Sequence, residues 1–243
     1  MPGSIVLLSG GLDSTVNFKI ALDGGSVLKA LTFDYGQRAA RREIEAATAM
    51  CDRFGVSHET IRLPWLRRIT TTALVRRDRS VPRPQNNELD AGERESVTAA
   101  QVWVPNRNGV FLAIGASFAE ALGADEVVPG FNREEAASFP DNSSGFVAAV
   151  NGSLRFSTRS GVRVRCHTSR RKKRSILQLG LEIGAPLDIV WCCYEGGRAM
   201  CGRCESCCRF LRATEDAGAE AWFRDHHQRL PPPLRTTTKR RSP

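Results

Sequence analysis

The sequence predicts an α/β fold, a doubly wound parallel sheet followed by a C-terminal cysteine-rich segment that binds a metal. Short apolar runs alternate with helical stretches through the N-terminal half. A turn with two glycines joins the first apolar run to the first helical stretch, and most of the eight cysteines gather near the C-terminus. These three observations define the elements that follow.

The N-terminal half supplies the alternation that a parallel sheet requires. Ile5–Leu8 is uniformly apolar, as a buried strand of such a sheet is, and the residues after Thr15 follow a helical pattern. The alternation continues with a predicted strand over Val27–Phe33, a helix over Arg38–Phe54 and a strand over His58–Leu63.

Residues 63–102 break the pattern, because arginines, prolines and asparagines replace the apolar positions. We expect a long surface loop here, mobile in part. Order resumes with a buried helix from Asn108 or Gly109 through Leu122. The remaining predicted elements are strands over Asp125–Pro129 and Val162–Arg165, and helices over Lys173–Ile183 and about Arg209–Ala217.

Three regions follow from these elements. Residues 1–190 form the α/β domain, and residues 191–218 form a metal-binding region with a helix. Residues 219–243 form a C-terminal segment that is largely a disordered tail, because prolines, threonines and basic residues fill its end.

Bulk composition is that of a soluble globular enzyme, with 41% hydrophobic and 25% charged residues. The sequence lacks both a run of about twenty apolar residues and a basic leader, so we expect a cytoplasmic protein with no membrane partner. The net charge of +9 favours anionic partners. The basic stretches Arg165–Arg174 and Arg235–Arg241 lack interleaved aromatics, so a solvated surface and a nucleic-acid patch both stay open. We do not expect nucleic acid as a direct substrate.

The segment SGGLDST, residues 9–15, has the composition of a phosphate-binding loop. Glycine lets the backbone approach an anion, and a helix that begins directly afterwards offers unpaired N–H groups and the positive end of its dipole. We therefore expect the loop to bind a phosphate or pyrophosphate. The alternative is a tight strand-to-helix turn in which Ser14 or Asp13 is a simple N-cap.

The cysteine cluster has the spacing of a metal site, since two CxxC units overlap at Cys204. Four thiolates close a tetrahedral Zn²⁺ site, which is then structural because no position stays open for water. An iron–sulfur cluster and a redox CxxC pair are the alternatives. Cys192 and Cys208 are expected to point elsewhere. The predicted ligands are Cys193, Cys201, Cys204 and Cys207.

The glycine loop resembles the pyrophosphate loop of the ATP-pyrophosphatase group, and further segments narrow the resemblance. Collinear from about Ile5 to Gly218, the chain resembles the 7-cyano-7-deazaguanine synthase family. The segments that carry this resemblance are FDYGQR (33–38), VPNRN (104–108), GFNREEAASFPDNS (130–143) and the cysteine segment 191–207.

The resemblance implies a fold of the adenine nucleotide alpha hydrolase type, a homodimer and one structural Zn²⁺ per subunit. Members convert 7-carboxy-7-deazaguanine, ammonia and two ATP into the nitrile, an intermediate for queuosine and archaeosine. The implied path runs through an adenylated acid, an amide and an adenylated amide, with positioning and charge stabilisation as the main catalytic effects.

The resemblance also implies roles in ATP binding. Asp13 would hold the Mg²⁺ that bridges the phosphates, with an N-cap role as the alternative. Lys173 and Arg107 would stabilise charge at the α-phosphate; the alternatives are a solvated side chain for Lys173 and a surface ion pair for Arg107. The β,γ-phosphates would be cradled by Ser9, Gly10, Gly11, Ser14 and Thr15, and the predicted ATP-binding residues also include Leu8, Leu12 and Asp13.

Substrate residues follow in the same way. Gln37 and Arg38 would orient substrate or phosphate, or else sit at the surface where a helix starts. Glu135, Phe139 and Asp141 lie past the end of a strand, where open α/β sheets bind ligands. A carboxylate there could accept from the ring N1–H and the exocyclic amine while Phe139 stacks on the ring. The alternative is a capped loop with a buried Phe139.

The sequence departs from the family pattern in three places. Cys192 stands where a serine is usual, Ser175 replaces a glutamate after the matching Lys173, and residues 63–102 are unusually polar. Two other functions stay open, the first because of the altered segment around Lys173 and the second because of the basic stretches. One is a related ligase that joins the deazapurine acid to another amine or to a protein. The other is a zinc-containing nucleic-acid-binding module.

Overall fold

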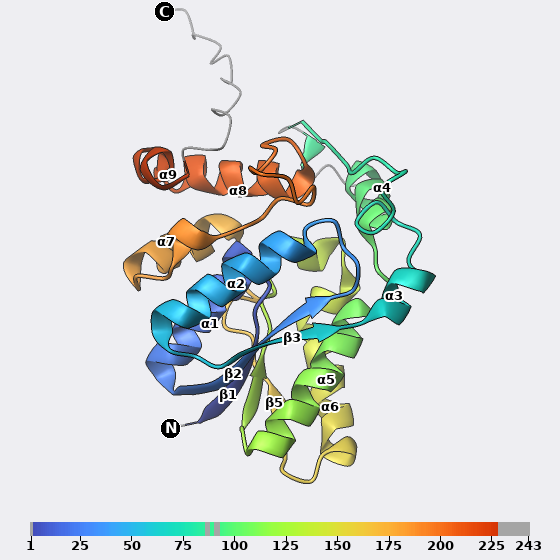
Figure 1. The fold of residues 1–243 in the computed structure, drawn as a ribbon, viewed down its shortest axis with the longest axis vertical. Helices are drawn as coiled ribbons and strands as arrows, with labels where there is room; N and C mark the ends of the chain where they lie inside the picture. Colours follow the sequence, from blue (N-terminus) through green and yellow to red (C-terminus); the bar gives the residue numbers. More distant parts are fainter. Residues whose placement is uncertain (1, 86–87, 90–92, 228–243) are drawn as a thin grey trace, which may run out of the picture.

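The structure is a computed structural model that describes residues 2–85, 88–89 and 93–227 (Figure 1). Its centre is a five-stranded parallel sheet in the order β3-β2-β1-β4-β5. The predicted doubly wound sheet is therefore confirmed, with the order reversing between β1 and β4. The strands are β1 (Gly3–Leu7), β2 (Ser26–Asp34), β3 (His58–Arg62), β4 (Glu126–Val128) and β5 (Arg163–Val164).

Helices cover both faces of the sheet. On one face lie α1 (Leu12–Gly24), α2 (Ala40–Phe54) and α7 (Lys173–Glu182), and on the other α5 (Arg107–Leu122) and α6 (Ser144–Ser157) (Figure 1). Strand β1 serves both cores, because successive side chains of a strand point to opposite faces. Ile5 and Leu7 pack into the core under α5, whereas Val6 packs into the core under α1.

The two ends of segment 63–102 correct the expectation of a long surface loop, whereas residues 70–85 between them form turns and loop as expected. The segment contains α3 (Pro64–Ile69) and α4 (Glu93–Val102), and its Leu66, Leu74 and Val75 are buried in the core. Its few apolar side chains are spaced too irregularly for a periodic pattern, yet each of these three packs against the end of the sheet. Tertiary packing therefore orders a segment whose local pattern predicts a loop.

Two further helices lie where the sequence predicted none. Helix α6 begins after Ser143, whose hydroxyl accepts a hydrogen bond from the N–H of Phe146 at 3.1 Å, a standard N-cap. Helix α9 (Glu220–His226) lies in the segment expected to be largely tail, and it packs on α8 (Glu205–Asp216) through Phe223 and Phe210. The tail expected over residues 230–243 lies outside the described residues. Among the described helices, none is long and apolar enough to cross a bilayer.

Candidate active site and metal centre

A cavity opens at the carboxyl ends of β1, β2 and β4, at the point where the strand order reverses. Ligands bind at this place in open α/β sheets. The predicted residues that line it are Leu8, Ser9, Gly11, Leu12, Asp13, Ser14, Gln37, Arg107, Glu135, Phe139 and Lys173. One cavity thus collects side chains from widely separated parts of the sequence.

The glycine loop ends at Gly11, which is the N-cap of α1 and carries no side-chain cap. Neither Asp13 nor Ser14 acts as an N-cap, so that alternative is wrong. Instead the Ser14 hydroxyl lies 3.0 Å from that of Ser9 and accepts from the Ser9 N–H at 3.3 Å. The first N–H groups of α1 have no partner within the helix, and the residues that carry them, Leu12, Asp13 and Ser14, line the cavity.

Gly10 and Thr15 take part in the loop without lining the cavity. Gly10 has a φ of +75°, and a Cβ there would lie 2.8 Å from the Cβ of Ala46 in α2. The Thr15 hydroxyl donates to the Gly11 carbonyl at 2.8 Å and is fully buried. The Thr15 hydroxyl thus stabilises the turn from inside the fold, whereas the sequence had suggested that it contacts phosphate.

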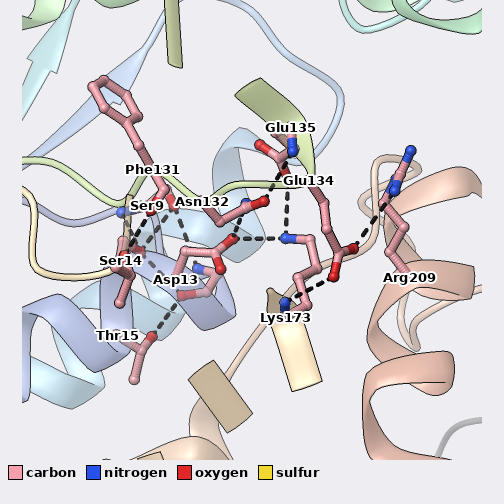
Figure 2. Close-up of polar contacts among 12 residues, drawn as sticks. Ser9, Asp13, Ser14, Thr15, Phe131, Asn132, Glu134, Glu135, Lys173 and Arg209 are labelled. Atoms are coloured by element: carbon pink, nitrogen blue, oxygen red, sulfur yellow. Dashed lines mark hydrogen bonds and ion pairs between the residues drawn. The ribbon is translucent and has the colours of Figure 1, made fainter. Parts of the chain in front are cut away.

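Lys173 and two carboxylates form an ion cluster beside the loop (Figure 2). The Lys173 ammonium lies 2.6 Å from Asp13 Oδ2 and 2.9 Å from Glu135 Oε1, and its side chain is only 9% exposed. Burial opposes the lysine charge, but the two carboxylates outweigh it and raise the pKa of Lys173. Although burial raises the pKa of Glu135, Lys173 more than compensates and lowers it. Lys173 is therefore a buried cation, which excludes the solvated alternative.

Asn132 completes this cluster, and the sequence analysis did not single it out. Its amide donates to Asp13 Oδ2 at 3.1 Å, and its carbonyl oxygen accepts from the N–H of Glu135 at 2.9 Å. The other oxygen of Asp13, Oδ1, is buried and accepts no hydrogen bond from the described residues. A buried carboxylate oxygen without a donor suits a hard cation such as Mg²⁺.

The opposite wall of the cavity carries a cation, Arg107, and an acid, Glu43. Arg107 donates to the Tyr35 hydroxyl at 3.2 Å, and within the described part of the chain it forms no ion pair with a carboxylate. Glu43, at the start of α2, lines the same cavity and accepts from the Gln37 amide at 2.9 Å. Burial raises the pKa of Glu43, while the charge of Arg107 acts against this rise. The sequence analysis missed Glu43 because it looks like one more charge on a polar helix.

Two predicted substrate residues lie outside the cavity lining. Arg38 forms an ion pair with Glu195 at 2.9 Å and donates to the Arg76 carbonyl at 2.7 Å, which ties neighbouring loops together. The Asp141 carboxylate accepts from Asn142, and burial raises its pKa. Phe139 does line the cavity, half-buried and parallel to Trp103 with 6.2 Å between ring centroids.

The four cysteines predicted as ligands converge at a second centre. The sulfur atoms of Cys193, Cys201, Cys204 and Cys207 all lie within 4.8 Å of one another. Backbone N–H groups donate to two of them, from Glu195 and Cys201 to Cys193 and from Cys204 to Cys201. Such donors stabilise thiolates, so the donor set fits a metal ion.

The two neighbouring cysteines lie beside this centre, as expected. The sulfur of Cys192 lies 3.3 Å from that of Met200, and Cys192 also lines the active-site cavity. Cys208 faces the Pro84 carbonyl at 3.7 Å.

The glycine loop precedes α1 on a doubly wound sheet, and a buried lysine lies beside the loop. These features together define a protein of the PP-loop ATP-pyrophosphatase class. Residues 3–218 match the model of the family described as "Queuosine biosynthesis protein QueC". The chain belongs to this family.

Named relatives agree with this assignment. The chain is 54% identical over 217 residues to a protein of Pelotomaculum thermopropionicum named 7-cyano-7-deazaguanine synthase, covering 89% of this chain and 98% of that one. It is 45% identical over 218 residues to a protein of the same name from Methanosarcina mazei, covering 88% and 94%.

Two solved structures show a remote likeness. The U34-tRNA thiolase NcsA from Methanococcus maripaludis, solved with its [4Fe-4S] cluster, is 15% identical with a TM-score of 0.47 and covers 93% of this chain and 67% of its own. NMN synthetase from Francisella tularensis is 15% identical with a TM-score of 0.44, covering 94% and 86%.

Proposed function

We propose that this protein converts 7-carboxy-7-deazaguanine and ammonia into 7-cyano-7-deazaguanine at the expense of two ATP. The observation that carries the proposal is the single cavity in which the glycine loop, the Asp13–Lys173–Glu135 cluster and Arg107 face one another. This arrangement can bind a triphosphate at one end and an organic acid at the other. Membership of the QueC family supports the same chemistry.

The loop end of the cavity is the phosphate end. The start of α1 and the Ser9 and Ser14 hydroxyls offer hydrogen-bond donors and positive potential to the β,γ-phosphates. Asp13 Oδ1 is the available ligand for the Mg²⁺ that accompanies ATP, and this ion supplies neutralisation of the phosphate charge. Lys173 adds a buried positive charge that is already in place before nucleotide binds, so little reorganisation is needed.

The opposite end suits the deazapurine. Arg107 is a cation that can pair with the substrate carboxylate or with the phosphate attacked by it. Glu43 is an acceptor for the ring N1–H and exocyclic amine, a role that the sequence suggested for the carboxylate of Glu135 or Asp141. Since Glu135 is engaged by Lys173 at 2.9 Å, whereas Glu43 Oε1 accepts no hydrogen bond from the described residues, Glu43 is the better candidate. Phe139 supplies a ring face for stacking.

The reaction then proceeds without a covalent bond to the enzyme. The substrate carboxylate attacks the α-phosphorus of ATP and releases pyrophosphate, and ammonia displaces AMP to give the amide with loss of a proton. The amide oxygen attacks a second ATP in the same way, and loss of AMP and of both N–H protons leaves the nitrile. The protein positions the groups and stabilises charge at phosphorus, mainly through Lys173 and Arg107.

The four-cysteine centre holds a structural Zn²⁺ in this proposal. Four sulfur ligands fill a tetrahedral site and leave none for substrate, so the metal supplies folding energy rather than chemistry. An iron–sulfur cluster is the alternative for the same ligands, and metal analysis with an absorbance spectrum separates the two. In this proposal the protein acts as a homodimer in the cytoplasm.

The related ligase is less favoured than the synthase. It was motivated by the altered segment around Lys173, yet the structure puts Lys173 between two carboxylates in the cavity. The two functions differ in product, because a ligase stops at an amide or a conjugate.

The test is turnover of the purified protein with the acid, ammonium and MgATP, followed by mass spectrometry. We expect the nitrile, with about two AMP and two pyrophosphate for each nitrile formed. Asp13→Asn should abolish AMP release, while Gly152→Ala, on an open face of α6, should not. An amide as the final product would support the ligase, and absence of AMP would refute adenylation altogether.

A further inference from the structure

Glu134 bridges the start of α7 and the helix of the metal centre, α8 (Figure 2). Its Oε1 accepts from the backbone N–H of Lys173 at 2.9 Å. Its Oε2 accepts from Arg212 of α8 at 3.3 Å and lies 3.7 Å from the guanidinium of Arg209. The Glu134 side chain is only 14% exposed, so these contacts are shielded from bulk water.

The contact with Lys173 acts as an N-cap supplied from another segment. Helix α7 begins at Lys173, and its own N-cap, Lys172, makes no side-chain cap. A carboxylate at this end satisfies an orphan N–H and complements the helix dipole. Since the next residue, Glu135, binds the Lys173 ammonium, two consecutive glutamates hold the backbone and the side-chain end of one lysine.

The other side of Glu134 leads to the metal centre. Helix α8 has Cys204 as its N-cap and carries Cys207, so the cysteine cluster anchors its first turn. Arg209 is 4% exposed and is held by Glu205 at 3.1 Å in the same turn of α8. The cysteine cluster therefore fixes α8, the arginines of α8 hold Glu134, and Glu134 holds the start of α7.

We propose that Glu134 is a positioning residue that couples the metal-centre helix to Lys173, keeping the lysine ammonium between Asp13 and Glu135. The proposal rests on the proposed function only in taking Lys173 to act on bound ATP. The cysteine centre would then help to position Lys173 in the cavity, although none of its four predicted ligands lines that cavity. A displacement of about 1 Å at a catalytic group costs on the order of 10²-fold in rate, so modest loosening is measurable.

The test is a double-mutant cycle between Glu134→Ala and Lys173→Gln. Glu134→Ala alone should lower kcat for AMP formation by roughly tenfold to a hundredfold, with the bound metal unchanged. In the Lys173→Gln background the same substitution should lower kcat by less than about twofold, because its effect passes through the lysine. Effects that simply multiply in the double variant would overturn the proposal, as would loss of metal from Glu134→Ala.

Two further variants and a second measurement test this interpretation. Glu134→Gln keeps an acceptor for the Lys173 N–H and should recover most of the activity, even where Glu134→Ala folds poorly. Glu182→Ala removes an exposed glutamate from the far end of α7 and should leave kcat unchanged. The cycle is also read by MgATP affinity in calorimetry. A wild type that makes no AMP refutes the proposed function alone, whereas uncoupled ATP affinities refute the role of Glu134.

Discussion

Gly130 is a residue whose lack of a side chain shapes the phosphate loop. It lies two residues after the end of β4, and a Cβ there would lie 2.5 Å from the backbone N and 2.6 Å from the Cα of Ser14. Backbone of the β4 end thus packs against the first turn of α1. The sequence contains this glycine beside Phe131 and Asn132, but the reason for it becomes visible only when both segments meet.

Gly130→Ala should therefore displace the start of α1. We expect MgATP affinity to fall about tenfold and the free energy of unfolding to fall by about 1–3 kcal/mol, the usual cost of overpacking. Calorimetric titration and urea unfolding measure the two effects. Gly152→Ala is the matched control, because a Cβ there meets nothing within 4 Å and alanine favours the α6 helix by about 0.5–1 kcal/mol. Unchanged affinity in Gly130→Ala would refute the loop as the phosphate site.

Glu43 tests the ring end of the cavity. Because Glu43→Gln replaces an anionic acceptor by a neutral amide, it should raise KM for the deazapurine acid about tenfold or more, with less than about twofold change in KM for ATP. Steady-state kinetics with each substrate varied in turn measure both. Glu45→Gln is the control, since Glu45 is 44% exposed on the same helix. A rise in KM for ATP alone would place the adenine, not the deazapurine, at Glu43.

Among the elements, α8 depends most on the cysteine centre, because its N-cap Cys204 and its Cys207 both belong to the four-sulfur cluster. Cys207→Ser should reduce the bound metal from about one per chain to near zero and speed hydrogen exchange in α8 and at the start of α7. Elemental analysis and exchange mass spectrometry measure this. Cys192→Ser should keep the metal, because its sulfur lies against Met200. Loss of metal from Cys192→Ser would contradict the ligand assignment.

The strands and the helices of the predicted α/β pattern could be read from sequence because each carries its own periodicity. The strand predicted at Ile5–Leu8 became β1, and the helix predicted at Lys173–Ile183 became α7. Helices α3 and α4 could not be predicted from the sequence, since their order comes from contacts of Leu66 and its neighbours with the end of the sheet. Hydrophobic periodicity shows which face of an element is buried. A short polar element buries too few apolar side chains to produce such a periodicity.

The residues of the candidate site likewise fall into those that could be predicted from the sequence and those that could not. The glycine loop and the four cysteines could be predicted because their chemistry is contiguous in sequence. Asn132 and Glu134 could not be predicted, because each matters through a partner far along the chain. Glu43 could not be predicted because only the fold brings it to the cavity. Lys173 lies in a run of basic residues, and only its burial between Asp13 and Glu135 distinguishes it from the exposed Lys172 and Arg174.

At the scale of the whole molecule, a chain of hydrogen bonds joins β3 to the strand that leads into the phosphate loop. The Thr32 hydroxyl donates to the Leu8 carbonyl at 2.6 Å, so it must accept from His58 Nε2 at 2.8 Å. The Thr48 hydroxyl lies 3.2 Å from His58 Nδ1, which accepts from it when the ring is neutral. A proton on Nδ1 would reverse that last bond, because the ring would then donate to the Thr48 hydroxyl.

Burial lowers the pKa of His58, although Asp52 nearby acts in the opposite direction. The unfolded chain therefore binds more protons than the fold near pH 6, and this contribution to stability is present above about pH 6.5 and lost as pH falls below it. We expect the free energy of unfolding to decrease between pH 7.5 and pH 5.5, with His58 contributing at most about 1.4 kcal/mol per pH unit. Urea unfolding of wild type and His58→Gln across this range measures the contribution. The variant should show the shallower slope, and coincident slopes would mean that His58 is protonated equally in the fold and in the unfolded chain.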